Sequence, residues 1–227
     1  NKHPDEAVFV NVYGNMRLFE LAAKYGCQHY IFASSGAVYQ PGNNKHLETD
    51  FRSSSDVYSA TKILAEDYLE AASRSYNVPV TSLRFFNIVG ACDITPHLIP
   101  DIVDQIMGDD LSISLGNLTT VRDYIGVEDI CDVIEKITSS VVRDVYSTFN
   151  VGTGKGYTGL QIFESICELT GCSKPLVQDP QRLRVSDRPS QIADARKLKE
   201  TYKKSDFAPL DEIVLDYLSW RNYFNAT

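Results

Sequence analysis

Helix-like and strand-like segments alternate along most of this chain, and this alternation constrains the fold more than any other feature. Amphipathic stretches predict helices, and short apolar runs between them predict buried strands. The predicted helices cover residues 5–25, 58–75, 98–107, 128–139, 160–170 and 210–224, and the predicted strands cover residues 29–34, 78–86, 111–115, 121–127 and 145–151. Such alternation indicates an α/β fold with a largely parallel sheet. It weakens after about residue 88, where we expect a smaller second lobe to begin.

The charge balance and the cysteines argue against several classes of protein. The 227 residues include 22 Lys and Arg against 30 Asp and Glu, a formal net charge of −8, which argues against a nucleic-acid partner. No apolar stretch is long enough to cross a membrane, so no membrane partner is expected. The five cysteines form no C-x-x-C pair and indicate reduced thiols in a cytoplasmic protein. The four histidines lack metal-ligand spacing, so we expect no metal.

A glycine-rich stretch, NVGTGKGYTG at residues 150–159, contains the spacing G-x-G-x-x-G between a predicted strand and a predicted helix. That context is typical of a turn that binds the pyrophosphate of a dinucleotide. An acidic residue, Asp179, even lies about twenty residues further on, where a ribose-binding carboxylate would be expected. One glycine pattern is weak support by itself, because tight strand-to-helix connections also favour glycine.

Two pairs of polar residues are candidates for proton transfer. Ser34 and Ser35 follow a predicted buried strand, at the end where open α/β sheets bind their ligands. Tyr58 and Lys62 are four residues apart on a predicted helix and therefore share one face. A phenol with an ordinary pKa of about 10 is a poor base at neutral pH, but a neighbouring ammonium group would stabilise the phenolate. The alternatives are serines that cap a loop and an exposed Tyr/Lys pair on a solvated helix.

Two further segments carry candidates for ligand binding. LRFFN at residues 83–87 ends a strand with two aromatic side chains and an amide, and VRDYIGVEDI at residues 121–130 begins a strand with Arg122 and Asp123. Taken singly, the aromatic residues are strand core, the amide is a turn residue, and the Arg-Asp pair is a surface salt bridge.

In this order, the motifs S-S-x-x-V-Y, Y-x-x-x-K, R-x-F-N, V-R-D-Y-I-x-V-x-D and N-x-G-T-G resemble the extended short-chain dehydrogenase/reductase family. The resemblance covers nearly the whole chain and is closest to the NAD-dependent epimerase/dehydratase branch that includes the UDP-glucose 4-epimerases. It implies a partial Rossmann-like doubly wound parallel sheet with a smaller C-terminal substrate-binding α/β lobe. Residues 1–90 would form the C-terminal part of the NAD-binding domain with the catalytic Ser, Tyr and Lys. Residues 91–227 would mainly bind the sugar nucleotide, with some segments returning to the Rossmann sheet.

The resemblance also changes the interpretation of the glycine-rich stretch. Residues 150–154 match the late N-x-G-T-G turn of the family, whereas the dinucleotide glycines of the family occur further upstream than Asn1. We therefore expect a tight strand-to-helix connection at residues 150–159 and an accidental spacing of Asp179. The NAD site is expected to be incomplete in this chain, and the choice between NAD and NADP stays open because the ribose-binding segment is absent.

By the resemblance, Ser35, Tyr58 and Lys62 are the catalytic residues. Ser35 would hydrogen-bond an oxygen of the sugar, Tyr58 would take the proton of its 4-hydroxyl, and Lys62 would hold the nicotinamide ribose. The positions implied to contact the cofactor are Asn11, Ser34, Tyr58, Lys62, Phe85 and Phe86. Those implied to bind the substrate are Ser35, Asn87, Leu98, Arg122, Arg184 and Gln191. Among these, Asn87, Arg122 and Arg184 match positions that hold the diphosphate, and Gln191 falls near the position that selects sugar size.

The implied function is an NAD-dependent epimerase of nucleotide-diphosphate sugars such as UDP-glucose, which oxidises the C4 hydroxyl by hydride transfer to NAD and returns the hydride. A dehydratase is disfavoured, because Gly36 and Ala37 stand where sugar dehydratases carry an acidic pair. Two alternatives stay open. The short loop between Gly90 and Leu98 is also compatible with an NAD(P)-dependent 4-keto-sugar-nucleotide reductase. The incomplete cofactor site is compatible with a truncated, inactive sugar-nucleotide binder. The resemblance further implies a homodimer through the helices at residues 5–25 and 58–75.

Overall fold

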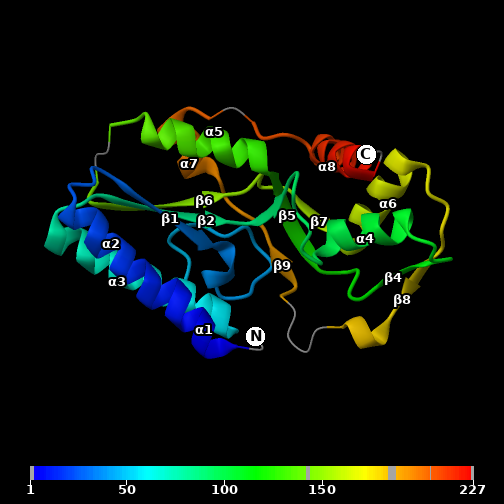
Figure 1. Ribbon diagram of the computed structural model, residues 1–227, viewed down its shortest axis with the longest axis horizontal. Coiled ribbons are helices and arrows are strands. Elements are labelled where there is room, and N and C mark those ends of the chain that lie inside the picture. The colour runs from blue at the N-terminus through cyan, green and yellow to red at the C-terminus, as the bar shows by residue number, and fades with distance from the viewer. Residues whose placement is uncertain (1–2, 142–143, 184–187, 205, 226–227) are drawn as a thin grey trace.

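The computed structural model describes residues 3–141, 144–183, 188–204 and 206–225. A three-stranded parallel sheet is the centre of one half of the molecule. Its strand order is β1 (Tyr30–Ser35), β2 (Val80–Phe85) and β6 (Tyr146–Val151). Helices α2 (Asn15–Lys24) and α3 (Val57–Tyr76) cover one face, and α5 (Val127–Thr138) and α7 (Arg196–Tyr202) cover the other (Figure 1). The predicted alternation therefore produces a layered α/β arrangement.

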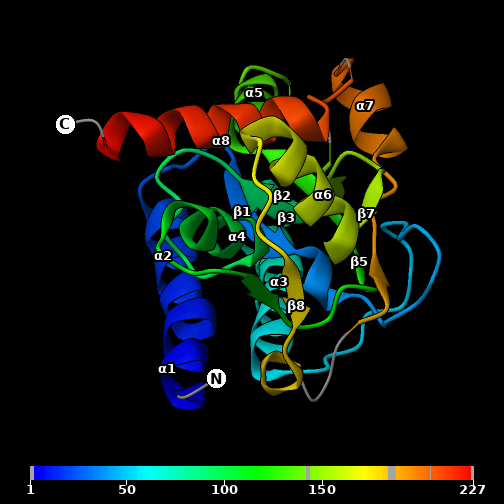
Figure 2. The same cartoon turned by 90° about the vertical axis from the view of Figure 1, so that its right-hand side faces the viewer.

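A second, mixed sheet lies in the other half of the molecule. Strand β5 (Val121–Gly126) pairs in parallel with β3 (Asn87–Val89) and β9 (Ser190–Gln191), and antiparallel with β7 (Gly156–Thr158). A two-stranded sheet joins β4 (Ile113–Leu115) to β8 (Leu176–Gln178). Helices α4 (Leu98–Met107), α6 (Gly159–Thr170) and α8 (Leu210–Asn225) gather around these strands (Figure 2).

Each half has its own apolar core. Phe19, Phe32 and Leu69 fill the space between the first sheet and helices α2 and α3, while Leu83 and Phe149 face α5 and α7. Strand β2 is buried at its first five residues, as expected for a central parallel strand covered on both faces. A separate cluster in the second half includes Ile99, Ile102, Ile162 and Tyr217.

The helix predicted over residues 5–25 differs from the structure in its middle. Helix α1 (Pro4–Val8) continues into a π-helix, Phe9–Gly14, and then into α2. Within the π-helical segment the Asn11 amide donates to Thr61 Oγ1 of α3 at 3.1 Å. The spacing of apolar residues predicts a helix but does not reveal the wider hydrogen-bond pattern of this turn.

Local capping fixes where α3 begins. The Asp56 side chain accepts from Ser59 N at 2.7 Å, and Ser59 Oγ accepts from Asp56 N at 3.2 Å, which together form a capping box. Tyr58 therefore lies in the first turn of α3. Among the described residues, no helix is both long enough and apolar enough to cross a membrane.

Candidate active site

A large groove with a cavity volume of about 1350 Å³ lies where the first sheet meets the second. The carboxyl ends of β1 and β2, the first turn of α3 and the segments around β3, β5 and β9 contribute to its lining. Open α/β sheets bind ligands at this end of their strands. The predicted site residues that line this groove are Ser34, Ser35, Tyr58, Lys62, Phe85, Phe86, Asn87, Leu98, Arg122 and Gln191.

The two neighbouring serines take different positions at the end of β1. Ser34 is buried, and its hydroxyl donates to Glu66 Oε1 at 2.5 Å. Ser35 caps a short 3₁₀ helix, Gly36–Val38, because its Oγ accepts from Ala37 N at 3.1 Å. Successive strand residues point to opposite sides, so the Ser34 hydroxyl contacts α3 while the Ser35 hydroxyl contacts the segment that follows β1.

Lys62 connects α3 to the end of β1. Its ammonium donates to the Ala33 carbonyl at 2.9 Å and lies 5.7 Å from the centre of the Tyr58 ring. Burial lowers the pKa of Lys62, and the charge of Glu66 opposes this shift. Tyr58 itself is 40% exposed and lines the groove. The predicted Tyr/Lys pair therefore shares one groove wall with the tip of β1.

A buried ion-pair network beneath the groove was not recognised from the sequence. Arg84 on β2 makes a two-pronged contact with Glu66 on α3, with Nε–Oε1 at 2.9 Å and Nη2–Oε2 at 2.6 Å. Arg52 adds a third contact to Glu66 Oε2 at 3.0 Å. Burial alone would raise the pKa of Glu66, but the hydrogen bonds and charge of Arg84, aided by Ser34 and Arg52, hold it below its usual value. This network fixes α3, and hence Tyr58 and Lys62, onto the sheet.

Two arginines, one on β5 and one just before β9, meet at the groove. Arg122 Nη1 donates to the carbonyls of Val121 at 2.9 Å and Arg188 at 2.8 Å. Arg188 also lines the groove but belongs to none of the motifs. The only sequence signal for it is its place in the same charged segment as Arg184, four residues further on.

Among the described site predictions, Asn11 does not line the groove. Its amide donates to Thr61 Oγ1 of α3, as described above. Arg184 lies outside the described residues.

The glycine-rich turn is filled by a side chain of the protein. The buried carboxylate of Asp123 accepts from Thr153 N at 2.9 Å, Gly154 N at 2.9 Å and Ala193 N at 3.1 Å. Gly154 has a positive φ of 78°, and a Cβ on Gly152 would lie 2.8 Å from the same carboxylate. The N–H groups of Thr153 and Gly154 are therefore already used by a carboxylate of the protein.

Asp179 plays an equally local part. Its side chain accepts from Gln181 N at 2.8 Å and caps the 3₁₀ helix Pro180–Arg182. Both observations agree with the interpretation of residues 150–159 as a tight connection between strand and helix.

Comparisons with known proteins identify related chains. A model of the NAD dependent epimerase/dehydratase family matches residues 1–152. Over 231 residues the chain is 29% identical to a UDP-glucose 4-epimerase of Lactobacillus helveticus. This match covers 92% of this chain and 69% of that protein. A GDP-6-deoxy-D-talose 4-dehydrogenase of Aggregatibacter actinomycetemcomitans is 36% identical over 180 residues, covering 79% of this chain and 55% of that protein.

Solved structures give the same result for the fold. MoeE5 in complex with UDP-glucose and NAD matches with a TM-score of 0.86 and 25% identity, covering 95% of this chain and 72% of that one. The predicted α/β class with a partial Rossmann-like sheet is confirmed, and so is the resemblance drawn from the motifs.

Proposed function

This chain belongs to the NAD-dependent epimerase/dehydratase family, and we propose that its groove binds a nucleotide-diphosphate sugar for oxidation and reduction at C4, in the manner of a UDP-glucose 4-epimerase. One observation carries the proposal: Ser35, Tyr58 and Lys62 line a single groove together with Arg122. NAD, the cofactor of this family, accepts and returns the hydride when bound.

The groove residues fit the nicotinamide end of this cofactor. The Lys62 ammonium has three N–H donors and uses one of them at the Ala33 carbonyl, so the others suit ribose hydroxyls. Phe85 and Phe86 line the same groove and offer apolar surface to a flat ring. In this proposal the residues most directly concerned with the cofactor are Lys62, Tyr58 and the two phenylalanines.

The proposed chemistry at the sugar is a proton transfer between two hydroxyl groups. Tyr58 takes the proton of the C4 hydroxyl as the hydride leaves C4, and Ser35 Oγ holds the same oxygen by a hydrogen bond. The Lys62 ammonium lies 5.7 Å from the centre of the Tyr58 ring. Arg122 and Asn87 bind the diphosphate, for which a planar guanidinium is well suited. Gln191 and Leu98 are proposed to contact the rest of the substrate.

A second candidate function is a nucleotide-sugar 4-dehydrogenase or 4-keto reductase that uses NAD(P). It is favoured by the 36% identity to the GDP-6-deoxy-D-talose 4-dehydrogenase. The same Ser, Tyr and Lys would act in it, but the hydride would not return to the same sugar. The two functions therefore differ in whether the cofactor is consumed in proportion to the product.

The test is an assay of the full-length protein with UDP-glucose and UDP-galactose, and separately with GDP-linked 6-deoxy sugars and NAD(P). Interconversion of the UDP sugars without net change in NADH absorbance supports the epimerase. Net reduction of the cofactor with a GDP sugar supports the dehydrogenase. Binding of UDP in calorimetry with no turnover of any of these sugars would instead favour an inactive sugar-nucleotide binder.

We also propose that the two parts of the chain have different roles and that the protein forms a homodimer. Residues 1–90 supply the catalytic side of the groove, and residues 91–227 supply mainly the substrate side, with β6 returning to the first sheet.

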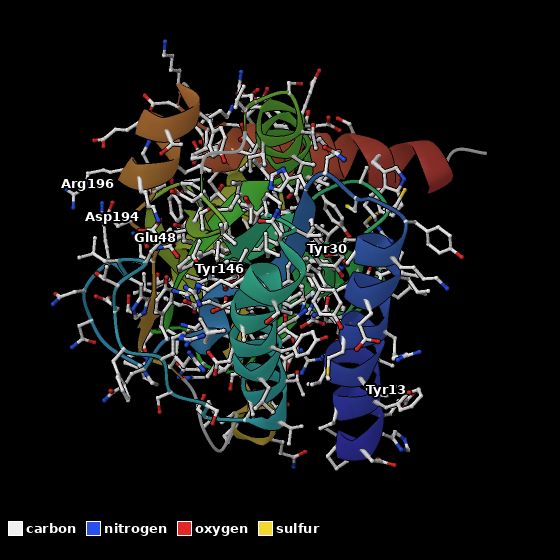
Figure 3. All side chains as sticks on the ribbon, turned by 90° about the vertical axis from the view of Figure 1, so that its left-hand side faces the viewer. Tyr13, Tyr30, Glu48, Tyr146, Asp194 and Arg196 are labelled. Atoms are coloured by element: carbon white, nitrogen blue, oxygen red, sulfur yellow. The ribbon has the colours of Figure 1, made fainter. Side chains whose placement is uncertain are left out.

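The outer face formed by α1, the π-helix, α2 and α3 exposes Phe9, Leu18 and Leu64, each more than half accessible. Figure 3 shows these helices side by side, with Tyr13 pointing away from α3.

This apolar face is the proposed homodimer contact, through a bundle of helices from two subunits. Light scattering on the full-length protein tests it, since a strict monomer at micromolar concentration would contradict it. A cytoplasmic location is proposed on the ground that the five cysteines are free thiols.

A further inference from the structure

Arg188 is a groove residue that makes three hydrogen bonds with its guanidinium. Nη1 donates to the Tyr39 carbonyl at 2.8 Å, and Nη2 donates both to the Ala37 carbonyl at 2.6 Å and to Ser55 Oγ at 2.6 Å. Tyr39 and Ala37 belong to the segment that follows Ser35, whereas Ser55 belongs to the turn that precedes α3. A single charged side chain therefore joins two segments that are distant in sequence.

Each of these contacts is next to a proposed catalytic side chain. Both backbone polar groups of Ala37 are hydrogen-bonded, because its N–H donates to Ser35 Oγ at 3.1 Å and its carbonyl accepts from Arg188. Ser55 directly precedes the N-cap residue of α3, and the first turn of α3 carries Tyr58. Arg188 thus helps to set how far the Ser35 hydroxyl lies from the start of α3.

The same two segments are also joined by residues that do not line the groove. Ser53 N donates to the Val38 carbonyl at 2.9 Å, and Gln40 N donates to the Phe51 carbonyl at 3.0 Å. These backbone bonds hold the loop together without Arg188. The contribution of Arg188 is therefore confined to the end of the loop that faces the groove.

The charge and the backbone of Arg188 link it to Arg122 on β5. Burial lowers the pKa of Arg188, Asp56 opposes this shift and Arg122 adds to it, and a guanidinium keeps its proton under such conditions. The Arg188 carbonyl accepts from Arg122 Nη1 at 2.8 Å. The arginine proposed to bind the diphosphate is therefore hydrogen-bonded to the residue that holds the Ser35 segment and the start of α3.

We propose that Arg188 is a positioning residue for the chemistry at C4, a role that rests on the proposed function. It acts through Ser35 and Tyr58 by holding their segments at a fixed separation, and it couples this geometry to Arg122 on the substrate side. Proton transfer and hydride transfer are sensitive to such geometry, because a misplacement of about 1 Å can cost about 10²-fold in rate. The C4 oxygen must meet both side chains at once.

The experiment compares Arg188→Met and Arg188→Lys with a matched control, Arg196→Met. Arg196 also pairs through its guanidinium, with Asp194 at 2.7 Å, but its side chain is largely exposed and it does not line the groove. In the full-length protein with saturating NAD, Arg188→Met is expected to lower kcat about 10²-fold and to change KM for the sugar nucleotide less than about threefold. Arg188→Lys keeps the positive charge but has its donors on a single nitrogen, so it should recover part of kcat. Arg196→Met should match the wild type.

A second measurement is independent of activity. Amide hydrogen exchange on the 227-residue chain should speed up at residues 36–39 and 55–60 in Arg188→Met, and not in Arg196→Met. If wild-type protein turns over none of the sugar nucleotides, the proposed function fails, and the exchange result alone then decides the role of Arg188 in holding the two segments.

Three results would overturn the inference: unchanged exchange at both segments, an unchanged kcat, or a loss expressed wholly in KM. If Arg188→Met does not fold, Arg188→Lys is compared with the wild type by the same two measurements. Wild-type kcat and exchange in Arg188→Lys would then contradict the proposed role.

Discussion

The ammonium of Lys62 lies 5.7 Å from the centre of the Tyr58 ring while it donates a 2.9 Å hydrogen bond to the Ala33 carbonyl at the end of β1. Helix α3 and strand β1 therefore meet at a charged group beside a phenol. Because the groove passes over both residues, this relationship yields direct tests of the proposed proton transfer.

Tyr58→Phe removes the proposed base and keeps the ring. We expect kcat to fall by about 10²- to 10⁴-fold, the usual contribution of a positioned acid or base. UDP binding, measured by calorimetry, should be unchanged. Tyr25→Phe is the matched control, because Tyr25 is exposed and lies outside the groove. Wild-type turnover in Tyr58→Phe would remove Tyr58 from the mechanism.

The pH dependence of activity should report Lys62. Burial lowers the pKa of Lys62 from its ordinary value of 10.5, so its charge is lost as the pH rises through a point below 10.5. We expect kcat to decline on the alkaline side below that value. Lys62→Arg, whose guanidinium stays protonated, should move the decline to higher pH. A decline at the same pH in both proteins would assign it to another group.

Glu66→Gln should destabilise the protein strongly, because it leaves the buried Arg84 without its carboxylate. Loss of one partner of a buried pair costs about 3–5 kcal/mol. The folded-state pKa of Glu66 is lowered, so its contribution is complete above 4.5 and is lost as the pH falls below 4.5. Urea unfolding should therefore show the largest difference at neutral pH and convergence in acid. Glu70→Gln, on the exposed face of α3, is the control.

Gly152→Ala tests the interpretation of the glycine-rich turn. The added Cβ would lie 2.7 Å from Ala193 Cβ and 2.8 Å from Asp123 Oδ2, so we expect a loss of stability of about 1–3 kcal/mol. If the turn is structural, any NAD affinity of the folded variant should equal that of the wild type. A selective loss of NAD binding at full stability would restore the dinucleotide interpretation.

The elements with a clear apolar period were predictable from the sequence. The helix predicted at residues 98–107 is α4, Leu98–Met107, because Ile99, Ile102 and Val103 repeat on one buried face. The π-helix at Phe9–Gly14 was not predictable, since apolar spacing does not encode the choice of hydrogen-bond partner. The pairing of β4 with β8 likewise depends on contacts between distant segments.

The site was predictable only in part, because some of its residues are brought together by contacts between segments that are distant in the sequence. Tyr58 and Lys62 are four residues apart on one helix, so their spacing alone predicts that they share a face, whereas their meeting with Ser35 was predicted only from the family resemblance. Arg188 is separated from Ser55 by 133 residues and from Ala37 by 151 residues. No periodicity links residues over such spans, and Glu66 and Arg84 also come from different elements.

The Asp123 carboxylate accepts hydrogen bonds from amide groups of the turn after β6 and of the segment after β9. The turn thereby carries an anion of its own. Inorganic phosphate should have no affinity for it, and a designer who wished to graft nucleotide recognition onto this turn would first have to replace Asp123.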